Sequence, residues 1–302
     1  MSQIDVPPLP KLPLGETISL SYAWFFQKFA DVLRVSWLWL MLCIVLFGIE
    51  NWLHWSWLTA AFAHASKGAT HFQAPALPLG LGFLMMLAWL AMMFGTTSVA
   101  VAWHRRILLN EQPGLSGRNV ASRALWRYIG IGIAITLITI LPIAIVMFPT
   151  MFLLAPAQGS QPDAAFFLMI PIIFVIYIAA LAIMLRLSVL LPARAIGDTA
   201  LTFGQAWRRT RGNTWRMFWG LLACSIPPLI VLEIISAVVW AAIGTSKLVS
   251  TDGQMPVPPF GLIMMSAIMF VLSLLIVPIY IGFLSHSYRH FFQGGIDVDE
   301  LI

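Results

Sequence analysis

Residues 128–154 read YIGIGIAITLITILPIAIVMFPTMFLL and contain no charged side chain. An α-helix needs about 20 apolar residues to cross the roughly 30 Å hydrocarbon core of a bilayer. This stretch is therefore long enough to span a membrane, and other apolar runs of similar length lie along the chain. Together they predict six transmembrane helices, near residues 35–58, 79–103, 128–154, 165–192, 217–243 and 259–286.

The composition agrees with a membrane protein. Hydrophobic residues make up 60% of the chain and charged residues only 10%, far below the roughly 25% charge of an ordinary soluble domain. So much apolar surface does not fit inside one water-soluble core. Because the short alternating strands of an outer-membrane barrel are absent from the sequence, we predict an all-α fold, a polytopic membrane helical bundle.

The basic residues predict the orientation of the chain in the membrane. Lys and Arg are retained on the cytoplasmic side during insertion, and they concentrate in the loops after the second and fourth predicted spans. Both termini and both basic loops should therefore be cytoplasmic. No secretory signal is evident at the start of the sequence. We expect a flexible Pro-rich tail over residues 1–15, one membrane domain over 16–290 and a short tail over 291–302.

The sequence also indicates an internal repeat. AWFFQKFADVLRVSW (23–37) and AWRRTRGNTWRMFW (206–219) each pass through a polar break into a predicted span, and ASRALWRYIGIG (121–132) is a weaker third copy. Each unit would contain an amphipathic cytoplasmic helix and two spans, with units near 16–110, 111–198 and 199–290. Chance similarity among membrane segments is the alternative.

The stretch 206–219 has the pattern of a helix lying in the membrane interface. At about 100° per residue its arginines occupy one arc and its apolar residues the opposite arc. Gly212 and Asn213 would form the hinge into the next span, Asn213 capping the new helix. Residues 18–30 fit the same role, with an aromatic face toward lipid. The candidate residues for binding anionic lipid headgroups are Arg105, Arg106, Arg208, Arg209, Arg211 and Arg216.

The basic charge has two further interpretations. It can serve only to set the topology, with no specific ligand. Nucleic acid is a further partner for a basic surface, but no recognised nucleic-acid fold accompanies the charge, so we expect none. Membrane lipids, above all anionic ones, are the expected partners. A homo-oligomer is compatible with the sequence, which identifies no protein partner.

Three ionisable residues lie inside predicted spans, where charge is costly and often functional. Glu50 and Glu233 are related by the same offset as the repeat, and would share a proton or a cation if their spans met. Alternatively, Glu50 lies near the outer interface and Glu233 bonds to a neighbouring helix. Arg186 would extend its side chain to the cytoplasmic interface, or pair with Asp198 or a lipid phosphate.

No catalytic constellation, cofactor motif or metal site is expected. Glu50 and His54 share a helix face, with His64 and His71 further along, but the spacing matches no established zinc motif. The sequence has no Gly-rich phosphate loop, nucleophile elbow or intramembrane Asp pair. Cys43 and Cys224 lie in apolar spans, where thiols usually behave as small hydrophobic groups.

One segment resembles a known family. The run from RLSVLLPARAIGD (186–198) through TFGQAWRRTRGNTWRMF (202–218) resembles the link between spans four and five in YciC-like bacterial inner-membrane proteins. It is also similar to the membrane domain attached to some glycerophosphodiester phosphodiesterases. The positions that match are Pro192, Ala206, Thr210, Gly212 and Asn213. AVAWHRRILLNEQPG (100–114) looks like a feature of uncharacterised relatives. The resemblance implies a multi-pass bacterial inner-membrane protein and no reaction.

These observations favour a non-enzymatic membrane protein that organises the membrane or acts as a scaffold for lipids or proteins. A small transporter or channel that uses Glu50 and Glu233 is the alternative. A membrane-embedded lipid enzyme is the third hypothesis, and it would need a cluster of polar groups in a cavity, which the sequence does not show.

Overall fold

The computed structural model describes residues 11–65, 79–114, 122–153, 164–243 and 260–294. These residues form helices joined by short segments and contain no strand, which confirms the all-α prediction. In chain order the helices are α1 (Leu14–Gln27), α2 (Phe29–Ala65), α3 (Leu79–Leu109), α4 (Arg123–Leu153), α5 (Ala164–Leu187), α6 (Leu190–Ile196), α7 (Phe203–Arg209), α8 (Thr214–Ile243) and α9 (Phe260–Phe292).

Five helical segments of the described chain are long and apolar enough to cross a membrane. They are Phe29–His54, Gly80–Leu109, Arg123–Phe148, Pro171–Ile196 and Thr214–Val239. A multi-pass membrane protein is thus supported. The sixth predicted span, residues 259–286, overlaps α9, but most side chains in its first half lie outside the described residues. The count of six spans therefore stays a prediction.

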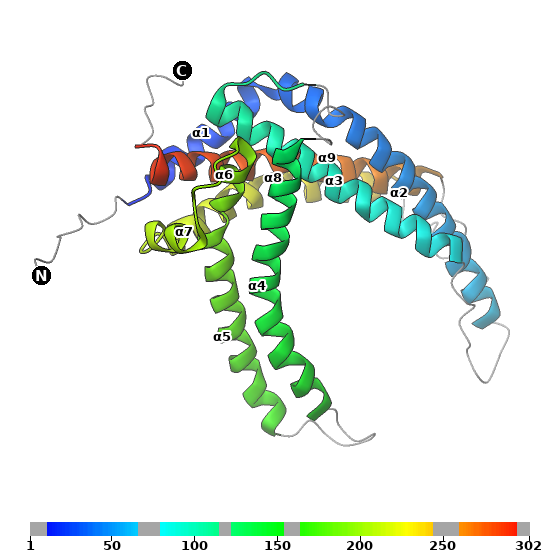
Figure 1. The fold of residues 1–302 in the computed structure, drawn as a ribbon. Helices are drawn as coiled ribbons and strands as arrows, with labels where there is room; N and C mark the ends of the chain where they lie inside the picture. Colours follow the sequence, from blue (N-terminus) through cyan, green and yellow to red (C-terminus); the bar gives the residue numbers. More distant parts are fainter. Residues whose placement is uncertain (1–10, 66–78, 115–121, 154–163, 244–259, 295–302) are drawn as a thin grey trace, which may run out of the picture.

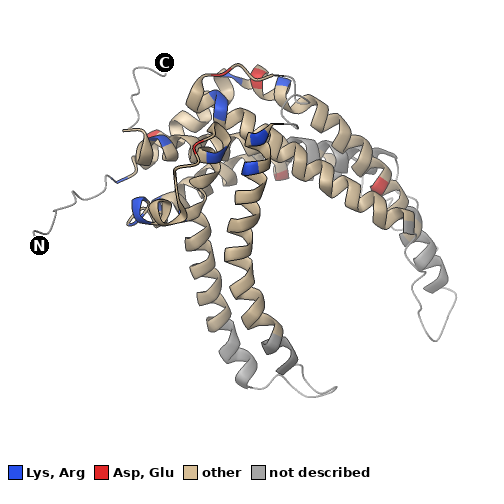
Figure 2. Ribbon diagram, in the orientation of Figure 1, with Lys and Arg blue, Asp and Glu red and all other residues tan. Residues whose placement is uncertain are grey.

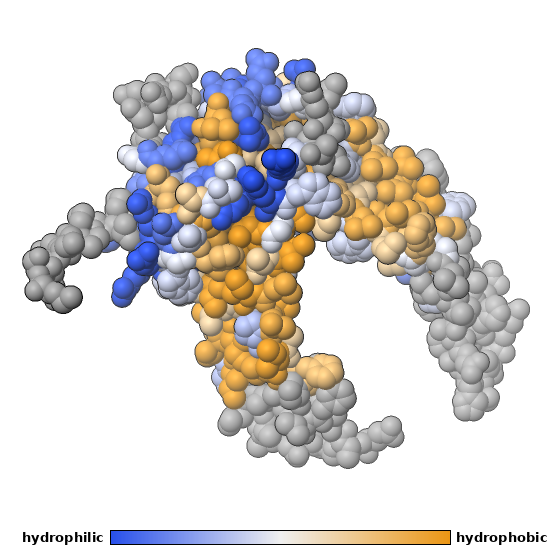
Figure 3. All heavy atoms as spheres, viewed as in Figure 1, coloured by the Kyte–Doolittle hydropathy of each residue, from blue (hydrophilic) through white to orange (hydrophobic). Residues whose placement is uncertain are grey.

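The helices pair into hairpins that diverge from a common head. α2 packs against α3, α4 against α5, and α8 against α9. In Figure 1 the α2–α3 and α4–α5 hairpins point in different directions, while α1, α6 and α7 gather where the hairpins meet. Figure 2 shows most Lys and Arg around this head, and Figure 3 shows hydrophobic residues covering the α4–α5 hairpin. Polar and apolar surfaces are thus separated along the molecule.

The hairpins contact one another in a cyclic order. The first helix of each packs against the second helix of another: α2 against α9, α4 against α3, and α8 against α5. In addition, α3, α6 and α9 pack pairwise, α1 packs against α8 and α9, and α7 packs against α5. The head is therefore held together by helices from every part of the described chain.

The buried core lies in this head. Trp103 and Phe283 are among the largest fully buried side chains, and both belong to one continuous hydrophobic cluster. Along the hairpins, by contrast, large apolar side chains are exposed: Phe148 is 68% exposed and Phe174 65% exposed. Continuous apolar surface of this extent is not stable in water and requires lipid or protein against it.

The N-terminal segment differs from the expected flexible tail over residues 1–15. Residues 1–10 lie outside the described chain, but Leu12 is fully buried and α1 begins at Leu14. α1 also differs from the expected lipid-facing helix, because it packs against α8 and α9. Phe25 is buried there, whereas Phe26 is 68% exposed. Only part of the predicted aromatic face is therefore available to lipid.

Candidate functional site

The predicted hinge residues lie in the turn between α7 and α8. α7 starts at a capping box, in which the Gln205 N–H donates to Thr202 Oγ1 and the Thr202 N–H donates to Gln205 Oε1. The chain leaves the helix after Arg209, and Gly212 has a φ of +80°. Only glycine adopts this conformation without strain, so Gly212 allows the chain to turn into α8.

Asn213 holds the N-terminal segment against this turn. Its backbone carbonyl accepts the N–H of Met217 in the first turn of α8, while its side-chain oxygen accepts the N–H of Leu12 at 2.9 Å. Arg216 completes the attachment, because its Nη1 donates to the Leu12 carbonyl at 2.7 Å. The expected capping role of the Asn213 side chain is thus replaced by a contact to a distant part of the chain.

The arginines on either side of the turn have different environments. Arg209 donates from Nη1 to the Phe291 carbonyl at 2.9 Å, and its guanidinium lies 5.5 Å from the centre of the Phe292 ring. The side chains of Arg208 and Arg211 are exposed and have no hydrogen bond or ion pair within the part of the chain that the structure describes. Of the four arginines in this stretch, these two are the ones available to an external anion.

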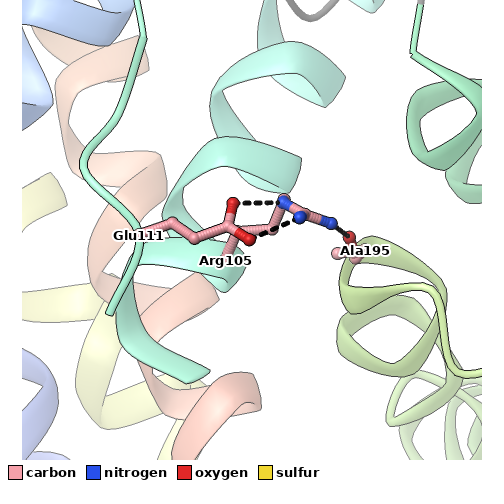
Figure 4. A network of polar contacts seen from close by, with 3 residues as sticks. All are labelled: Arg105, Glu111 and Ala195. Carbon is pink, nitrogen blue, oxygen red and sulfur yellow. Dashed lines mark hydrogen bonds and ion pairs between the residues drawn. The ribbon is translucent and has the colours of Figure 1, made fainter. Parts of the chain in front are cut away.

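Arg105 and Arg106, at the end of α3, are already neutralised by acidic residues. Arg105 donates from Nε and Nη2 to the two carboxylate oxygens of Glu111, at 2.8 and 2.6 Å, and from Nη1 to the Ala195 carbonyl at 3.0 Å (Figure 4). Arg106 donates from Nε to Asp31 Oδ2 at 3.0 Å. These contacts hold α3 against α6 and α2. The main role of both arginines is therefore to stabilise the packing of these helices.

Arg186 joins the end of α5 to α7. Its Nε donates to Thr210 Oγ1 at 3.3 Å, its Nη2 donates to the Trp207 carbonyl, and its guanidinium lies 3.5 Å from the centre of the Trp207 ring. The pairing with Asp198 considered from the sequence is wrong. Asp198 instead accepts the hydroxyl of Tyr288 at 2.9 Å. Arg186 therefore keeps its charge without an acidic partner among the described residues.

A cavity of about 390 Å³ lies between α5 and α8, next to this turn. Ile178, Leu181, Ala182 and Leu185 of α5 line one side, and the beginning of α8 lines the other. The α5 residues follow the i, i+3, i+4, i+7 spacing of a single helix face. The cavity is consequently an apolar groove that ends beside Arg186 and the α7–α8 turn.

The two intramembrane carboxylates are not brought together by any described contact. Glu50 lies half-buried on α2, whereas Glu233 is exposed on α8 among Ile230, Ile234 and other apolar residues. Neither side chain has a hydrogen bond or an ion pair within the described ranges. The matched offset in the sequence thus corresponds to two separate environments.

A buried polar cluster surrounds His104, a residue that the sequence did not single out as a candidate. His104 Nδ1 lies 2.7 Å from Ser285 Oγ, and Tyr128 Oη lies 3.5 Å from His104 Nε2. The Ser285 hydroxyl also donates to the Ile281 carbonyl of its own helix. These contacts join α3, α4 and α9.

The stretches AVAWHRRILL (100–109) and LSHSYRHFF (284–292) resemble each other, and both carry a histidine where α3 and α9 pack together. This resemblance is the signal in the sequence that points to the cluster. His286, which follows Ser285 on α9, is fully buried and has no partner for either ring nitrogen among the described residues. Cys43 and Cys224 are free and buried.

Among the described side chains, no three His, Cys, Asp or Glu groups are placed to hold a metal ion. The His64 side chain and all of His71 lie outside the described part. Comparison of the chain with protein-family models, curated proteins and solved structures finds no match. The resemblance to YciC-like proteins stays a prediction.

Proposed function

We propose that this protein organises the membrane or acts as a scaffold for lipids and proteins, without catalysis, by holding anionic lipids at its basic cytoplasmic face. The observation that carries the proposal is that the charges of Arg208 and Arg211 are exposed and unpaired among the described residues. Arg208 lies at the end of α7, and Arg211 lies in the turn that leads into α8. Each such cation near a membrane surface contributes about 1 kcal/mol to the binding of anionic lipid.

The aromatic residues around the turn support the same placement. Trp207 is 40% exposed, Trp215 is 63% exposed and Trp219 is 54% exposed. Tryptophan side chains favour the boundary between lipid headgroups and acyl chains. Exposed tryptophans next to exposed arginines therefore fit a surface that lies at headgroup level.

The proposal includes six spans, both termini in the cytoplasm and a location in a bacterial inner membrane. The cyclic contacts of the three hairpins agree with three repeated units arranged around α3, α6 and α9. In such an arrangement every hairpin presents its outer face to lipid, while the basic segments collect on one side. This is the geometry that we expect of a protein that orders lipid around itself.

The test is the lipid shell that the protein retains. In nanodiscs of phosphatidylglycerol and phosphatidylcholine in equal amounts, native mass spectrometry at low activation should show phosphatidylglycerol in excess. The double variant Arg208→Gln/Arg211→Gln should lose most of this excess, because about 2 kcal/mol of attraction is removed. An unchanged excess in the double variant would overturn the proposal.

A matched control tests whether an arginine that is already paired with a carboxylate contributes to the lipid excess. The variant Arg105→Gln/Glu111→Gln removes an arginine and its carboxylate partner together and leaves the net charge unchanged. The lipid excess should stay as in the unmodified protein. A loss as large as that of the arginine pair would show that the assay reports folding instead of lipid preference.

A further inference from the structure

The groove between α5 and α8 is large enough for part of a ligand. Its volume of about 390 Å³ lies within the roughly 300–1,000 Å³ typical of ligand sites. The α5 face that lines it, from Ile178 to Leu185, extends for about 10 Å at 1.5 Å per residue. Because these side chains are apolar and belong to a membrane-spanning segment, a hydrocarbon chain fits the groove.

The end of the groove at the head carries positive charge without compensation. Leu185 lines the groove and is followed directly by Arg186, and Gly212 lines it and directly follows Arg211. Because Leu185 and Gly212 line the same groove, Arg186 and Arg211 are placed beside its end, where their like charges repel each other. No carboxylate pairs with either one in the described part of the chain. Two unpaired cations at the same end of a groove are stabilised by an anion bound there.

We propose that this groove is the binding site of one anionic phospholipid, whose phosphate contacts Arg186 and Arg211 and whose acyl chain lies along α5. The inference rests on the proposed function, since it assumes that the head lies at headgroup level, and it extends that function from a general preference to one specific site. The charge at one end and the apolar groove beyond it match the two parts of a phospholipid.

The structure also explains why the site would be ordered. Arg186 is held by Thr210, by the Trp207 carbonyl and by the Trp207 ring. These hydrogen bonds use Nε and Nη2 of Arg186. Nη1 donates to none of the described residues and is therefore available to a ligand. Because the guanidinium is fixed before any ligand arrives, little side-chain entropy is lost on binding. A second protein chain bound at this site would need an acidic residue next to the two arginines, and a segment narrow enough to enter a groove that is as wide as a hydrocarbon chain.

The experiment uses nanodiscs of phosphatidylglycerol and phosphatidylcholine, and counts the lipid that remains on the protein at high activation in native mass spectrometry. We expect one phosphatidylglycerol. Arg211→Gln should reduce this population about tenfold, because it removes a charged hydrogen-bond partner. Ala182→Phe should also remove it by filling the groove. The matched controls are Arg34→Gln, the same change at an exposed arginine of α2, and Ile230→Phe on the exposed face of α8.

Each outcome decides the proposal. Loss of the retained lipid in Arg211→Gln and Ala182→Phe, with retention in both controls, supports it. Retention of phosphatidylcholine to the same extent, persistence in Ala182→Phe, or a second protein copy that Ala182→Phe displaces would overturn it. The test is independent of the general preference: a phosphatidylglycerol excess at low activation without one tightly held lipid refutes the site alone. If the unmodified protein shows no phosphatidylglycerol excess even at low activation, the proposed function itself is refuted.

Discussion

The N–H of Leu12 donates to the side-chain oxygen of Asn213, 2.9 Å away in space and 201 positions away in the chain. Since Arg216 donates to the carbonyl of the same leucine, both backbone groups of Leu12 are satisfied by the beginning of α8. This contact gives the turn at Gly212 and Asn213 a structural role besides its candidate role at the membrane surface.

Asn213→Ala should destabilise the protein by about 1–3 kcal/mol, because it leaves the buried N–H of Leu12 without an acceptor. Thermal unfolding in detergent measures the change. Asn51→Ala is the control, since the Asn51 side chain donates to the Phe47 carbonyl of its own helix turn. Equal effects of the two substitutions would contradict a special role for the attachment of Leu12.

Gly220→Ala should disturb the packing of α8 against α9. A Cβ at Gly220 would lie 2.1 Å from Cζ of Phe283, which is fully buried. Overpacking of this kind costs about 1–3 kcal/mol. Gly82→Ala is the control, because its Cβ would meet nothing within 4 Å, and it should be neutral or slightly stabilising. Adding Phe283→Leu to Gly220→Ala should restore part of the stability; no recovery would argue against the clash.

The two ion pairs at the end of α3 should differ in strength. The side chains of Arg106 and Asp31 are 13% and 26% exposed, against 30% and 48% for Arg105 and Glu111. Water screens the more exposed pair more strongly. Double-mutant cycles with alanine should therefore give about 0.5 kcal/mol or less for Arg105–Glu111 and more for Arg106–Asp31. The reverse order would show that geometry outweighs exposure here.

Stability should fall at alkaline pH through Tyr288. Burial, and then the hydrogen bond to Asp198, raise the pKa of its phenol above the ordinary value of 10.0. Between pH 10 and the raised pKa, the unfolded state loses the proton that the folded state keeps, so ionisation favours unfolding as pH rises. Unfolding midpoints measured from about pH 8 to pH 11 should decline less steeply in Tyr288→Phe. Parallel declines would disprove this contribution.

The position of the C-terminus distinguishes six spans from five. With the N-terminus in the cytoplasm, an even number of spans returns the C-terminus to the cytoplasm. Green fluorescent protein fused after Ile302 should therefore fluoresce, and alkaline phosphatase fused there should be inactive. The opposite result would mean that α9 does not cross the membrane, or that the N-terminus lies outside.

Much of the architecture could be predicted because membranes impose a simple rule on sequence. Uncharged runs such as 128–154 must be helical in lipid, where every backbone group has to be satisfied within the segment. The break at Gly212 and Asn213 was also evident, since glycine and asparagine are favoured at turns. Helical periodicity, however, describes one helix at a time and says little about its neighbours.

The contacts between distant residues could not be predicted for this reason. Nothing in the sequence near Leu12 indicates that Asn213 accepts its N–H. The arginines that looked equivalent differ because Arg105 and Arg106 meet carboxylates, while Arg208 and Arg211 meet none among the described residues. Likewise, the shared offset of Glu50 and Glu233 indicated a common site that the described contacts do not show. Which charges remain available is decided by tertiary packing.

The attachment of Leu12 also imposes an order on biosynthesis. A ribosome adds about 5–20 residues per second, so Asn213 is made on the order of 10–40 s after Leu12, given their separation of 201 residues. Until then α1 has neither this acceptor nor the surfaces of α8 and α9 on which it packs. α1, the first of the described helices, is consequently among the last to pack against its neighbours. A nascent protein halted before α8 would leave α1 without these contacts and accessible to proteases.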